Sequence, residues 1–358
     1  MSEPTASHPA EERVQKFMAE FEAQWRIAAP AFEDRNPDEP RRAFDLWRDL
    51  MVETTREHFT DDTGVNLAGS FSRPSVYGPD VEKFVRSEQV DDVFYVLTQT
   101  TLPLKSFHEY MLREQAGQWR IAAIADHYGD PTEPFEDPEH MRKRVAECGP
   151  DAPFDEMPEA QAQLDERRMF TDRVVTRPRD GETDEARVSR IGTLRTGSGV
   201  LSVLDFGYDN DDARPLARTV SPGTYVVERV TAFGRNAAVR VLFSDRDPVA
   251  WHPASIPGSG HVIGVDAGCV CIVDYPAYAS VSRRAKAAAF DRFIAAESPT
   301  AIEISLGAEE VGIAVDSGYG DGSYPVYWGV DAEGMIVQLV VDFMMLVDQD
   351  DDGVLTTL

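Results

Sequence analysis

The sequence predicts an α+β protein, and three features of its hydrophobic patterning carry that prediction. The first 60 residues place apolar side chains at helical spacing, and residues 92–128 alternate apolar and polar side chains as strands do. The part after residue 170 is rich in short strand-like runs. Helices followed by an antiparallel meander give a domain in which helices cover one sheet face. We therefore expect helices on a curved antiparallel sheet over residues 8–130 and a β-rich domain with one main helix over residues 171–350.

Two helices are expected at the start of the chain. Four apolar residues between Glu11 and Ala28 recur at spacings of 4, 3 and 4 and so share one helix face: Val14, Met18, Phe21 and Trp25. A second apolar stripe follows the break at Asn36–Asp38 and ends near His58. Asp80 is then expected to cap a short helix that holds Val81, Phe84 and Val85.

Three strands are expected next, because the period changes from helical to alternating after Gln89. They are Asp92–Thr101, Leu104–Arg113 and Gln118–Tyr128. The connections between them are short, which makes the strands an antiparallel meander.

Residues 131–170 are rich in proline and acidic residues and are interpreted as a partly helical connector. Asp137-Pro138 suits the cap and first turn of a short helix. Beyond the connector, one helix is expected at Ser282–Ala296. Strands are expected near Ser198–Phe206, Gly223–Phe233, Ala237–Phe243, Val262–Val265, Val270–Val273, Ala301–Ser305, Gly312–Asp316, Tyr324–Val330 and Met335–Leu346.

The net charge of −28 narrows the possible partners. Such a molecule repels nucleic acid phosphates and anionic membrane surfaces, so we expect it to bind neither. Attraction of a basic protein is the functional interpretation, while solubility and salt adaptation explain the same charge without a partner. Residues 1–150 carry 29 acids and 17 bases and residues 151–358 carry 34 and 18, so the acidity belongs to both halves.

Two further features bear on the compartment. The start of the chain is acidic rather than signal-like, and no apolar run approaches the roughly 20 residues of a membrane span. The three cysteines are too few for a disulfide framework. We therefore expect a cytoplasmic protein.

The meander of the first half resembles a known fold. Val93–Thr100, His108-Glu109-Tyr110 and Gly117–Ile121 are similar to the nuclear transport factor 2-like (NTF2-like) fold, in particular its bacterial NTF2-fold immunity branch. In that branch a strand ending in a Glu-Tyr pair precedes a closing Trp-Arg-Ile strand. The resemblance implies a helical cover over the sheet and an immunity role.

The second half resembles the bacterial domain of unknown function 4241. The similarity lies in Pro222–Val227, in Val265–Cys269 and above all in the run Ser317–Gly329, which is followed by Asp331, Gly334 and Val341–Phe343. The family carries no established chemistry. Its pairing with an immunity-type domain implies neutralisation of a secreted or contact-delivered toxin.

The run at residues 318–329 is the strongest candidate for a binding site. Its glycines permit close approach of a ligand or partner, but it lacks the ending and the following helix of a phosphate loop. The structural alternative is a tight β-arch whose aromatic residues pack inside. The candidate binding residues are Asp266, Asp321, Tyr324, Tyr327, Trp328, Asp331 and Asp342.

Other chemistry has weaker support. The Cys269-x-Cys271 pair lacks the partners of a zinc site, and six aspartates near the ends of expected strands match no metal-loop spacing: Asp266, Asp274, Asp316, Asp321, Asp331 and Asp342. We therefore expect no metal and no cofactor. Cys271 is expected in the core. In the first half, His108 and Asp126 lie on adjacent expected strands and suit an acid/base pair in an NTF2-like pocket, with His127 on the other face.

Together these features favour an immunity protein that binds a basic toxin and is not an enzyme. Its acidic surface would speed encounter with a cationic toxin, and aromatic residues on exposed loops would anchor the complex. The alternative is a hydrolase or isomerase that uses the His108–Asp126 pocket or an Asp-rich site in the second half.

Overall fold

The computed structural model describes residues 7–33, 41–103, 106–207, 213–307 and 309–358. The acidic start of the chain, the expected break at Asn36–Asp38 and Leu104, the first residue of the second expected strand, lie outside these residues. The chain divides into two compact units, Met1–Pro131 and Thr132–Leu358. Both units combine helices with antiparallel sheet, which confirms the α+β class.

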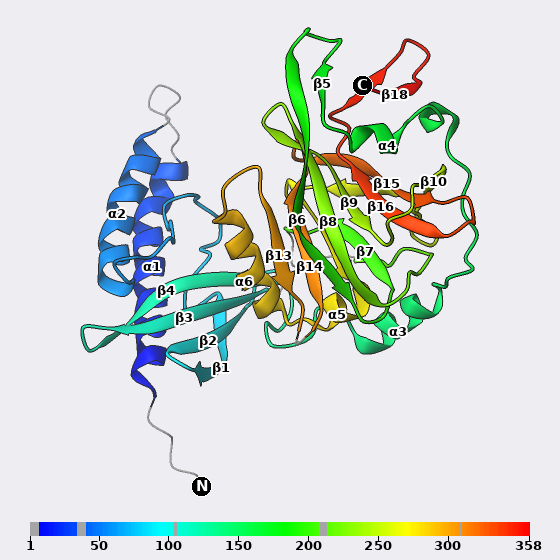
Figure 1. Cartoon of the computed structure of the whole chain (residues 1–358). Helices are drawn as coiled ribbons and strands as arrows, with labels where there is room; N and C mark the ends of the chain where they lie inside the picture. The colour runs from blue at the N-terminus through cyan, green and yellow to red at the C-terminus, as the bar shows by residue number, and fades with distance from the viewer. Residues whose placement is uncertain (1–6, 34–40, 104–105, 208–212, 308) are drawn as a thin grey trace. The chain divides into compact units, whose positions relative to one another are not determined.

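In the first unit, two long helices lie against one face of a four-stranded antiparallel sheet with the order β1-β2-β3-β4 (Figure 1). The elements are α1 (Pro9–Glu33), α2 (Arg42–His58), β1 (Glu82–Val90), β2 (Val93–Thr100), β3 (Phe107–Gln115) and β4 (Gln118–His127). The expected apolar stripes face the sheet, as buried Val14, Phe21 and Trp47 show. The indole N–H of Trp47 donates to the Ser70 carbonyl at 3.0 Å, so this buried polar group is satisfied.

The segment after Asp80 corrects one prediction, because it forms β1 and not a short helix. Val81, Phe84 and Val85 have helical spacing, yet β1 pairs with β2 along its whole length. The register shifts between Phe84 and Arg86, which marks a bulge that the local pattern does not reveal. Long-range pairing with β2 therefore outweighs the local helical pattern.

The second unit contains a network of 12 paired strands with the main order β10-β15-β16-β9-β8-β6-β14-β12-β7. Strand β11 pairs with β15, β13 with β14 and β5 with β6, and β17 and β18 form a separate hairpin. The strands are β5 (Arg173–Thr176), β6 (Thr183–Thr196), β7 (Leu201–Asp205), β8 (Gly223–Ala232), β9 (Arg235–Leu242), β10 (Ala250–Pro253), β11 (Val262–Val265), β12 (Cys269–Asp274), β13 (Ala301–Ser305), β14 (Val311–Asp316), β15 (Gly322–Val330), β16 (Ile336–Asp342), β17 (Val347–Gln349) and β18 (Leu355–Thr357).

The helical elements of this unit are short. They are α3 (Pro138–Ala146), the 3-10 turn η1 (Glu159–Gln161), α4 (Glu166–Met169), α5 (Tyr275–Ser280) and α6 (Arg283–Ile294). Asp137 caps α3 by accepting the backbone N–H groups of Glu139 and His140, as its sequence context predicts. Helix α6 lies within the expected span, whereas the sequence did not predict α5, β5, β6 or β10.

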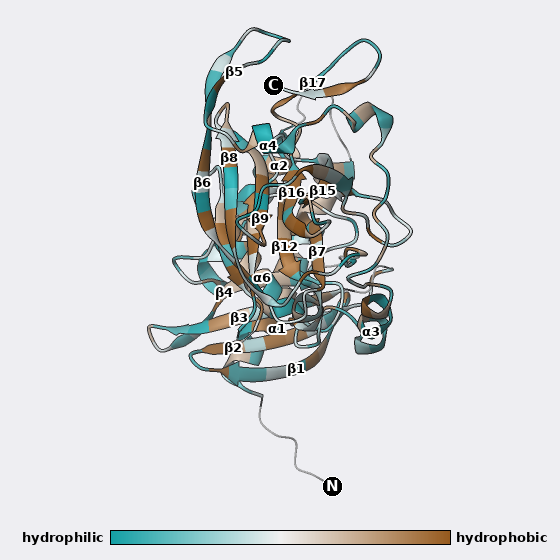
Figure 2. Ribbon diagram, turned by 45° about the vertical axis from the view of Figure 1, so that its right-hand side comes forward, coloured by the Kyte–Doolittle hydropathy of each residue, from teal (hydrophilic) through white to brown (hydrophobic). Residues whose placement is uncertain are grey.

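The core of the second unit lies on both faces of β12, whose side chains alternate between two clusters. Val270 and Ile272 join the larger cluster with β14, β15 and β16, and Cys271 joins a cluster with α5 and α6. Figure 2 shows the resulting run of hydrophobic strands. A strand covered on both faces reads as a continuous apolar run, which explains why β12 is recognisable from sequence.

Candidate functional site

The run at residues 317–329 forms an arch that leads into β15, and its aromatic side chains are buried. Tyr324, Tyr327 and Trp328 are 3%, 0% and 1% exposed. The Tyr324 Oη and the Ser317 Oγ both donate to the Gly320 carbonyl at 2.8 Å. Gly318 and Gly320 have φ values of +53° and +96°, which glycine adopts without strain. The arch therefore turns its aromatic rings inward and exposes only its tip.

The two buried candidate aspartates stabilise separate turns. Asp331 accepts the backbone N–H groups of Glu333 at 3.0 Å and Met335 at 2.8 Å, and its second oxygen lies 2.6 Å from the Arg246 guanidinium. Asp342 accepts the backbone N–H of Met344 at 2.6 Å. Both carboxylates therefore hold the chain at the ends of β16.

The other candidate aspartates, Asp266 and Asp321, are exposed. The backbone N–H of Asp266 donates to the Asp205 carboxylate at 2.7 Å, which ties the β7 end to the β11–β12 turn. Within the described parts of the chain, no three His, Cys, Asp or Glu side chains are placed to hold a metal ion. The four candidate aspartates are thus not gathered into one metal-binding cluster in the described structure.

A surface groove of about 680 Å³ lies where two family-like segments meet. Tyr225 and Pro222 line it from the start of β8, and Gly334 and Met335 line it from the β15–β16 turn. The Tyr225 and Phe243 rings meet edge to face at 4.9 Å and form its aromatic wall. Sequence analysis singled out both segments but had no signal that they line one groove.

Arg218 joins this groove to a neighbouring pocket of about 320 Å³ that Trp328 and Asp155 also line. Its guanidinium donates to the carbonyls of Pro150 and Ala152, each at 2.6 Å, and lies 3.7 Å from the Phe154 ring centre. Burial lowers the pKa of Arg218. The guanidinium thus fastens the segment after α3 to the sheet beside the groove.

Two buried carboxyl groups of the second unit, Glu166 and Asp342, influence each other electrostatically. Glu166 of α4 is 1% exposed and Asp342 is fully buried. Both Glu166 oxygens, the second Asp342 oxygen and the Tyr327 hydroxyl are buried without a hydrogen-bond partner in the described structure. Burial raises the pKa of Asp342 to about 7, and burial together with the Asp342 charge raises the pKa of Glu166 well above its usual range.

In the first unit, the structure brings His108 and Asp126 together as predicted, on directly paired positions of β3 and β4. His108 Nε2 lies 3.4 Å from Asp126 Oδ1, and His108 Nδ1 lies 3.0 Å from Glu82 Oε2. His127 faces Glu109 instead, at 3.5 Å. The three residues Glu82, His108 and Asp126 form a line from a buried carboxylate to an exposed one.

Glu82 is the residue of this cluster that sequence reasoning missed, because its segment was expected to be helical. Its carboxylate also accepts the Tyr110 hydroxyl at 2.9 and 3.0 Å. Burial lowers the pKa of His108, but the contact with Glu82 and the charges of Glu82 and Asp126 outweigh burial and raise it overall. The cluster therefore favours an imidazolium in a site that is almost closed to water, since His108 is 4% exposed.

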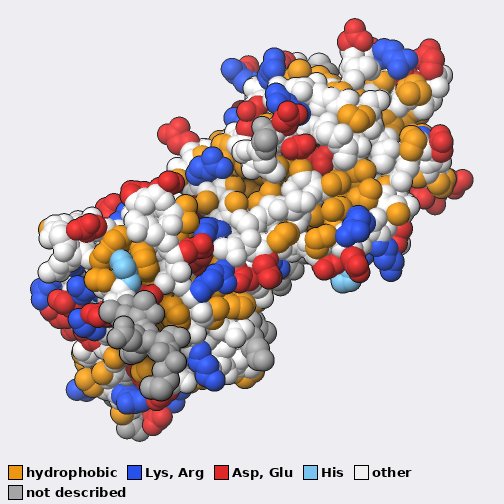
Figure 3. Space-filling view, turned by 90° about the horizontal axis from the view of Figure 1, so that it is seen from below, with side chains coloured by type: hydrophobic (Ala, Val, Ile, Leu, Met, Phe, Trp, Pro, Cys, Tyr) orange, Lys and Arg blue, Asp and Glu red, His pale blue; other side chains and the backbone are white. Residues whose placement is uncertain are grey.

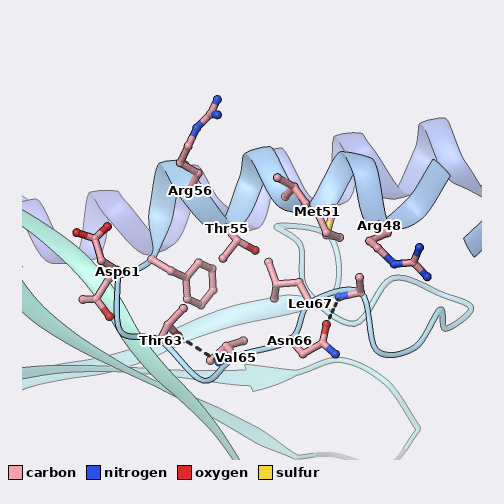
Figure 4. A pocket seen from close by; sticks show the side chains of 13 residues that line it. Arg48, Met51, Thr55, Arg56, Asp61, Thr63, Val65, Asn66 and Leu67 are labelled. Atoms are coloured by element: carbon pink, nitrogen blue, oxygen red, sulfur yellow. Dashed lines mark hydrogen bonds between the residues drawn. The ribbon is translucent and has the colours of Figure 1, made fainter. Parts of the chain in front are cut away.

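A pocket of about 430 Å³ separates α2 from the loop at residues 60–68 (Figure 4). Met51, Phe59 and Leu67 provide apolar walls, and Arg48 and Asp61 lie at opposite ends in the view. The Thr63 hydroxyl accepts the Val65 N–H at 3.2 Å and shapes the loop. His108 and Asp126 do not line this pocket.

The β17–β18 hairpin carries Asp348, Asp350 and Asp352 before Gly353, the spacing that opens a calcium loop. Asp350 accepts the backbone N–H groups of Asp352 at 3.0 Å and Val354 at 2.8 Å. Among the described residues these carboxylates do not gather as a metal site. The segment is therefore a turn closed by Asp350.

The cysteines are structural. Cys269 and Cys271 are buried in the core, as expected for Cys271, and the described cysteines form no disulfide. Burial raises the pKa of Cys269 to about 12. A thiol with that pKa is a poor nucleophile at neutral pH.

Comparison with known proteins identifies part of the second unit. Residues 194–341 match the model of a family described as "Protein of unknown function (DUF4241)", which confirms the resemblance predicted for this half. No curated protein and no solved structure matches the chain. Among the described helices, none is both long enough and apolar enough to cross a membrane.

Proposed function

We propose that the chain is an immunity protein of a bacterial toxin system, which neutralises a basic toxin by stoichiometric binding in the cytoplasm. The acidity of the chain carries this proposal. The net charge is −28, and acidic and basic side chains are interspersed over the face seen in Figure 3. An acidic excess spread over both halves provides long-range attraction for a cationic partner and disfavours nucleic acid and anionic membranes.

The first unit contributes the immunity-type part of the proposal. Two helices cover a four-stranded antiparallel sheet whose last strand contains Trp119-Arg120-Ile121. This arrangement agrees with the proposed NTF2-like fold of the immunity branch. The edge strand β1 exposes Phe84 by 53% and Val85 by 41%, and exposed apolar residues on a sheet edge suit contact with a partner.

The second unit offers a different contact surface. The groove beside Tyr225 and Phe243 has Met335 at its rim with 57% exposure. Partly exposed aromatic and methionine side chains in a groove are typical anchors of protein interfaces. The buried Tyr324, Tyr327 and Trp328 support the interface by holding the arch and not by touching the partner.

Co-expression with the toxin encoded beside this gene tests the proposal. We expect a co-purifying one-to-one complex, protection of the host cell, and affinity that weakens as salt concentration rises. Met335→Asp tests the groove, with Val249→Asp as the matched control, because Val249 is also an exposed apolar residue, at 68% against 57% for Met335, and does not line the groove. Failure of the wild-type chain to bind or protect contradicts the proposal.

A second candidate is a hydrolase or isomerase that uses His108 and Asp126. The observation in its favour is Glu82 behind the imidazole, 3.0 Å from Nδ1, in the order that orients a general acid or base. The Asp-rich version of this alternative lacks such support, because the described aspartates serve separate turns. The immunity role is favoured if His108→Gln still protects the host cell and variants that no longer bind the toxin do not. Catalysis is favoured if His108→Gln loses protection and variants that no longer bind the toxin keep it.

A further inference from the structure

A pocket of about 300 Å³ in the second unit is lined by basic side chains, although the whole chain is strongly acidic. Helix α3 contributes His140, Lys143 and Arg144, and Arg214 faces them from the segment that follows β7. Glu147 is the one acid among the described residues that line the pocket. Two segments far apart in the sequence thus bring cationic groups to one cavity.

The spacing of these residues on α3 makes them neighbours. Positions 140, 143 and 144 all line the pocket, so one side of α3 supplies an imidazole, an ammonium and a guanidinium group to it. Met141 and Val145 of the same helix pack against the core cluster that contains α5 and α6, which holds α3 in place.

The cations have distinct roles. Arg144 lies 3.0 Å from the Glu136 carboxylate and donates to the Ala213 carbonyl, so it positions the neighbouring segment that carries Arg214. Arg214 is half-buried and donates to the Ser259 hydroxyl at 2.8 Å, which orients its guanidinium. His140 and Lys143 are exposed and remain accessible from solvent.

The opposite wall of the pocket is apolar. Pro215, Ile256 and Pro257 form it, and Pro215 is buried. A ligand that fills the pocket therefore has an anionic end against the cations and a small apolar body against this wall. A phosphate group suits the anionic end, since its two negative charges and three acceptor oxygens match a guanidinium fork together with an ammonium group.

We propose that this pocket binds a small phosphate monoester, with Lys143 and Arg214 on the phosphate and Pro215, Ile256 and Pro257 around its organic group. The proposal does not depend on the immunity role. A net charge of −28 opposes non-specific anion binding elsewhere on the chain, so saturable phosphate binding would report a local site.

Isothermal titration calorimetry of the full chain at constant ionic strength tests the proposal with phenyl phosphate, inorganic phosphate and acetate. Lys143→Ala and Arg214→Ala probe the pocket. Arg142→Ala is the matched control, because Arg142 is an exposed cation of the same helix that does not line the pocket. Circular dichroism confirms that each variant is folded, and Lys143, being exposed, can be replaced without disturbing the core.

We expect saturable binding of phenyl phosphate, weaker binding of inorganic phosphate and the weakest binding of acetate. Lys143→Ala should weaken phenyl phosphate binding at least tenfold, and Arg142→Ala should leave it within twofold of wild type. Absence of saturable binding, equal affinity for acetate, or equal losses in Lys143→Ala and Arg142→Ala would overturn the proposal.

Discussion

The buried pair of Glu166 and Asp342 makes the stability of the second unit fall as the pH rises. Both groups are at most 1% exposed, and both Glu166 oxygens and the second Asp342 oxygen are buried without a hydrogen-bond partner among the described residues. The Asp342 charge also raises the pKa of Glu166. Charged carboxylates in such a place are costly, so the folded state retains a proton that the unfolded chain releases.

The pKa shift of Asp342 sets the size of this loss of stability. Its pKa rises from 3.8 to about 7, and each unit corresponds to about 1.4 kcal/mol, which gives a penalty of about 4 kcal/mol above neutral pH. Because the folded state holds more protons than the unfolded state between these values, the free energy of unfolding decreases from about pH 4 to pH 7. The loss is complete above the folded pKa.

Replacing Asp342 by Asn removes the carboxyl group whose raised pKa sets this penalty, and should flatten the pH dependence. Between pH 4 and pH 8.5 we expect wild type to lose about 4 kcal/mol of stability that Asp342→Asn does not lose. The free energy of unfolding of the second unit can be measured by hydrogen exchange at the amides of the buried segment Val337–Val341, after correction for intrinsic exchange rates.

The control is Glu297→Gln, which removes the same charge from an exposed position. It should reproduce the wild-type profile. Parallel pH profiles for wild type and Asp342→Asn between pH 4 and 8.5 would refute the reasoning, because they would show that folding does not raise the pKa of Asp342.

Two further predictions concern the arch and the histidine cluster. Gly318→Ala should destabilise the second unit by about 2 kcal/mol, because φ is +53° there and a Cβ would lie 2.8 Å from the Phe343 Cβ. The control is Gly264→Ala, whose added Cβ meets no atom within 4 Å. Equal urea midpoints for the two variants would contradict the prediction. Glu82→Gln should lower the pKa of His108, because the effect of burial then outweighs the remaining charge of Asp126. NMR titration of the imidazole measures this pKa. An unchanged pKa would contradict the role given to Glu82 in the cluster. In wild type the stabilisation by this ion pair is present below about pH 6.5 and is lost as the pH rises through the elevated pKa of His108.

The sequence was sufficient for elements whose cause is local. The stripe from Val14 to Phe21 predicts α1, and Asp137-Pro138 predicts the start of α3, because periodicity and capping act within a few residues. Paired alternation likewise predicts β3 and β4 and places His108 beside Asp126. These features need no knowledge of the rest of the chain.

Local sequence patterns do not predict elements and contacts that depend on distant partners. Strand β6 carries few apolar residues and is stabilised by pairing with β8 over most of its length. In the sequence nothing distinguishes Glu82 and Glu166 from acidic residues on the surface, and only the fold shows that each is buried. Their burial depends on segments at least 16 residues away, such as Thr98 beside Glu82, so a local pattern could not reveal it.

The arch at residues 317–329 shows how a distinctive motif is divided between structure and surface. A strand buried on both faces needs large apolar side chains, and Tyr324, Tyr327 and Trp328 meet that need in β15. The glycines before them permit the turn, which leaves Tyr319 at the tip with 55% exposure. Tyr319 is the large apolar side chain that this exposed tip offers to a partner. If the second unit contacts the proposed toxin through this motif, Tyr319→Ala should weaken the complex without changing the fold. Trp328→Ala should instead cost about 3–5 kcal/mol of stability, because it removes a buried indole from the core.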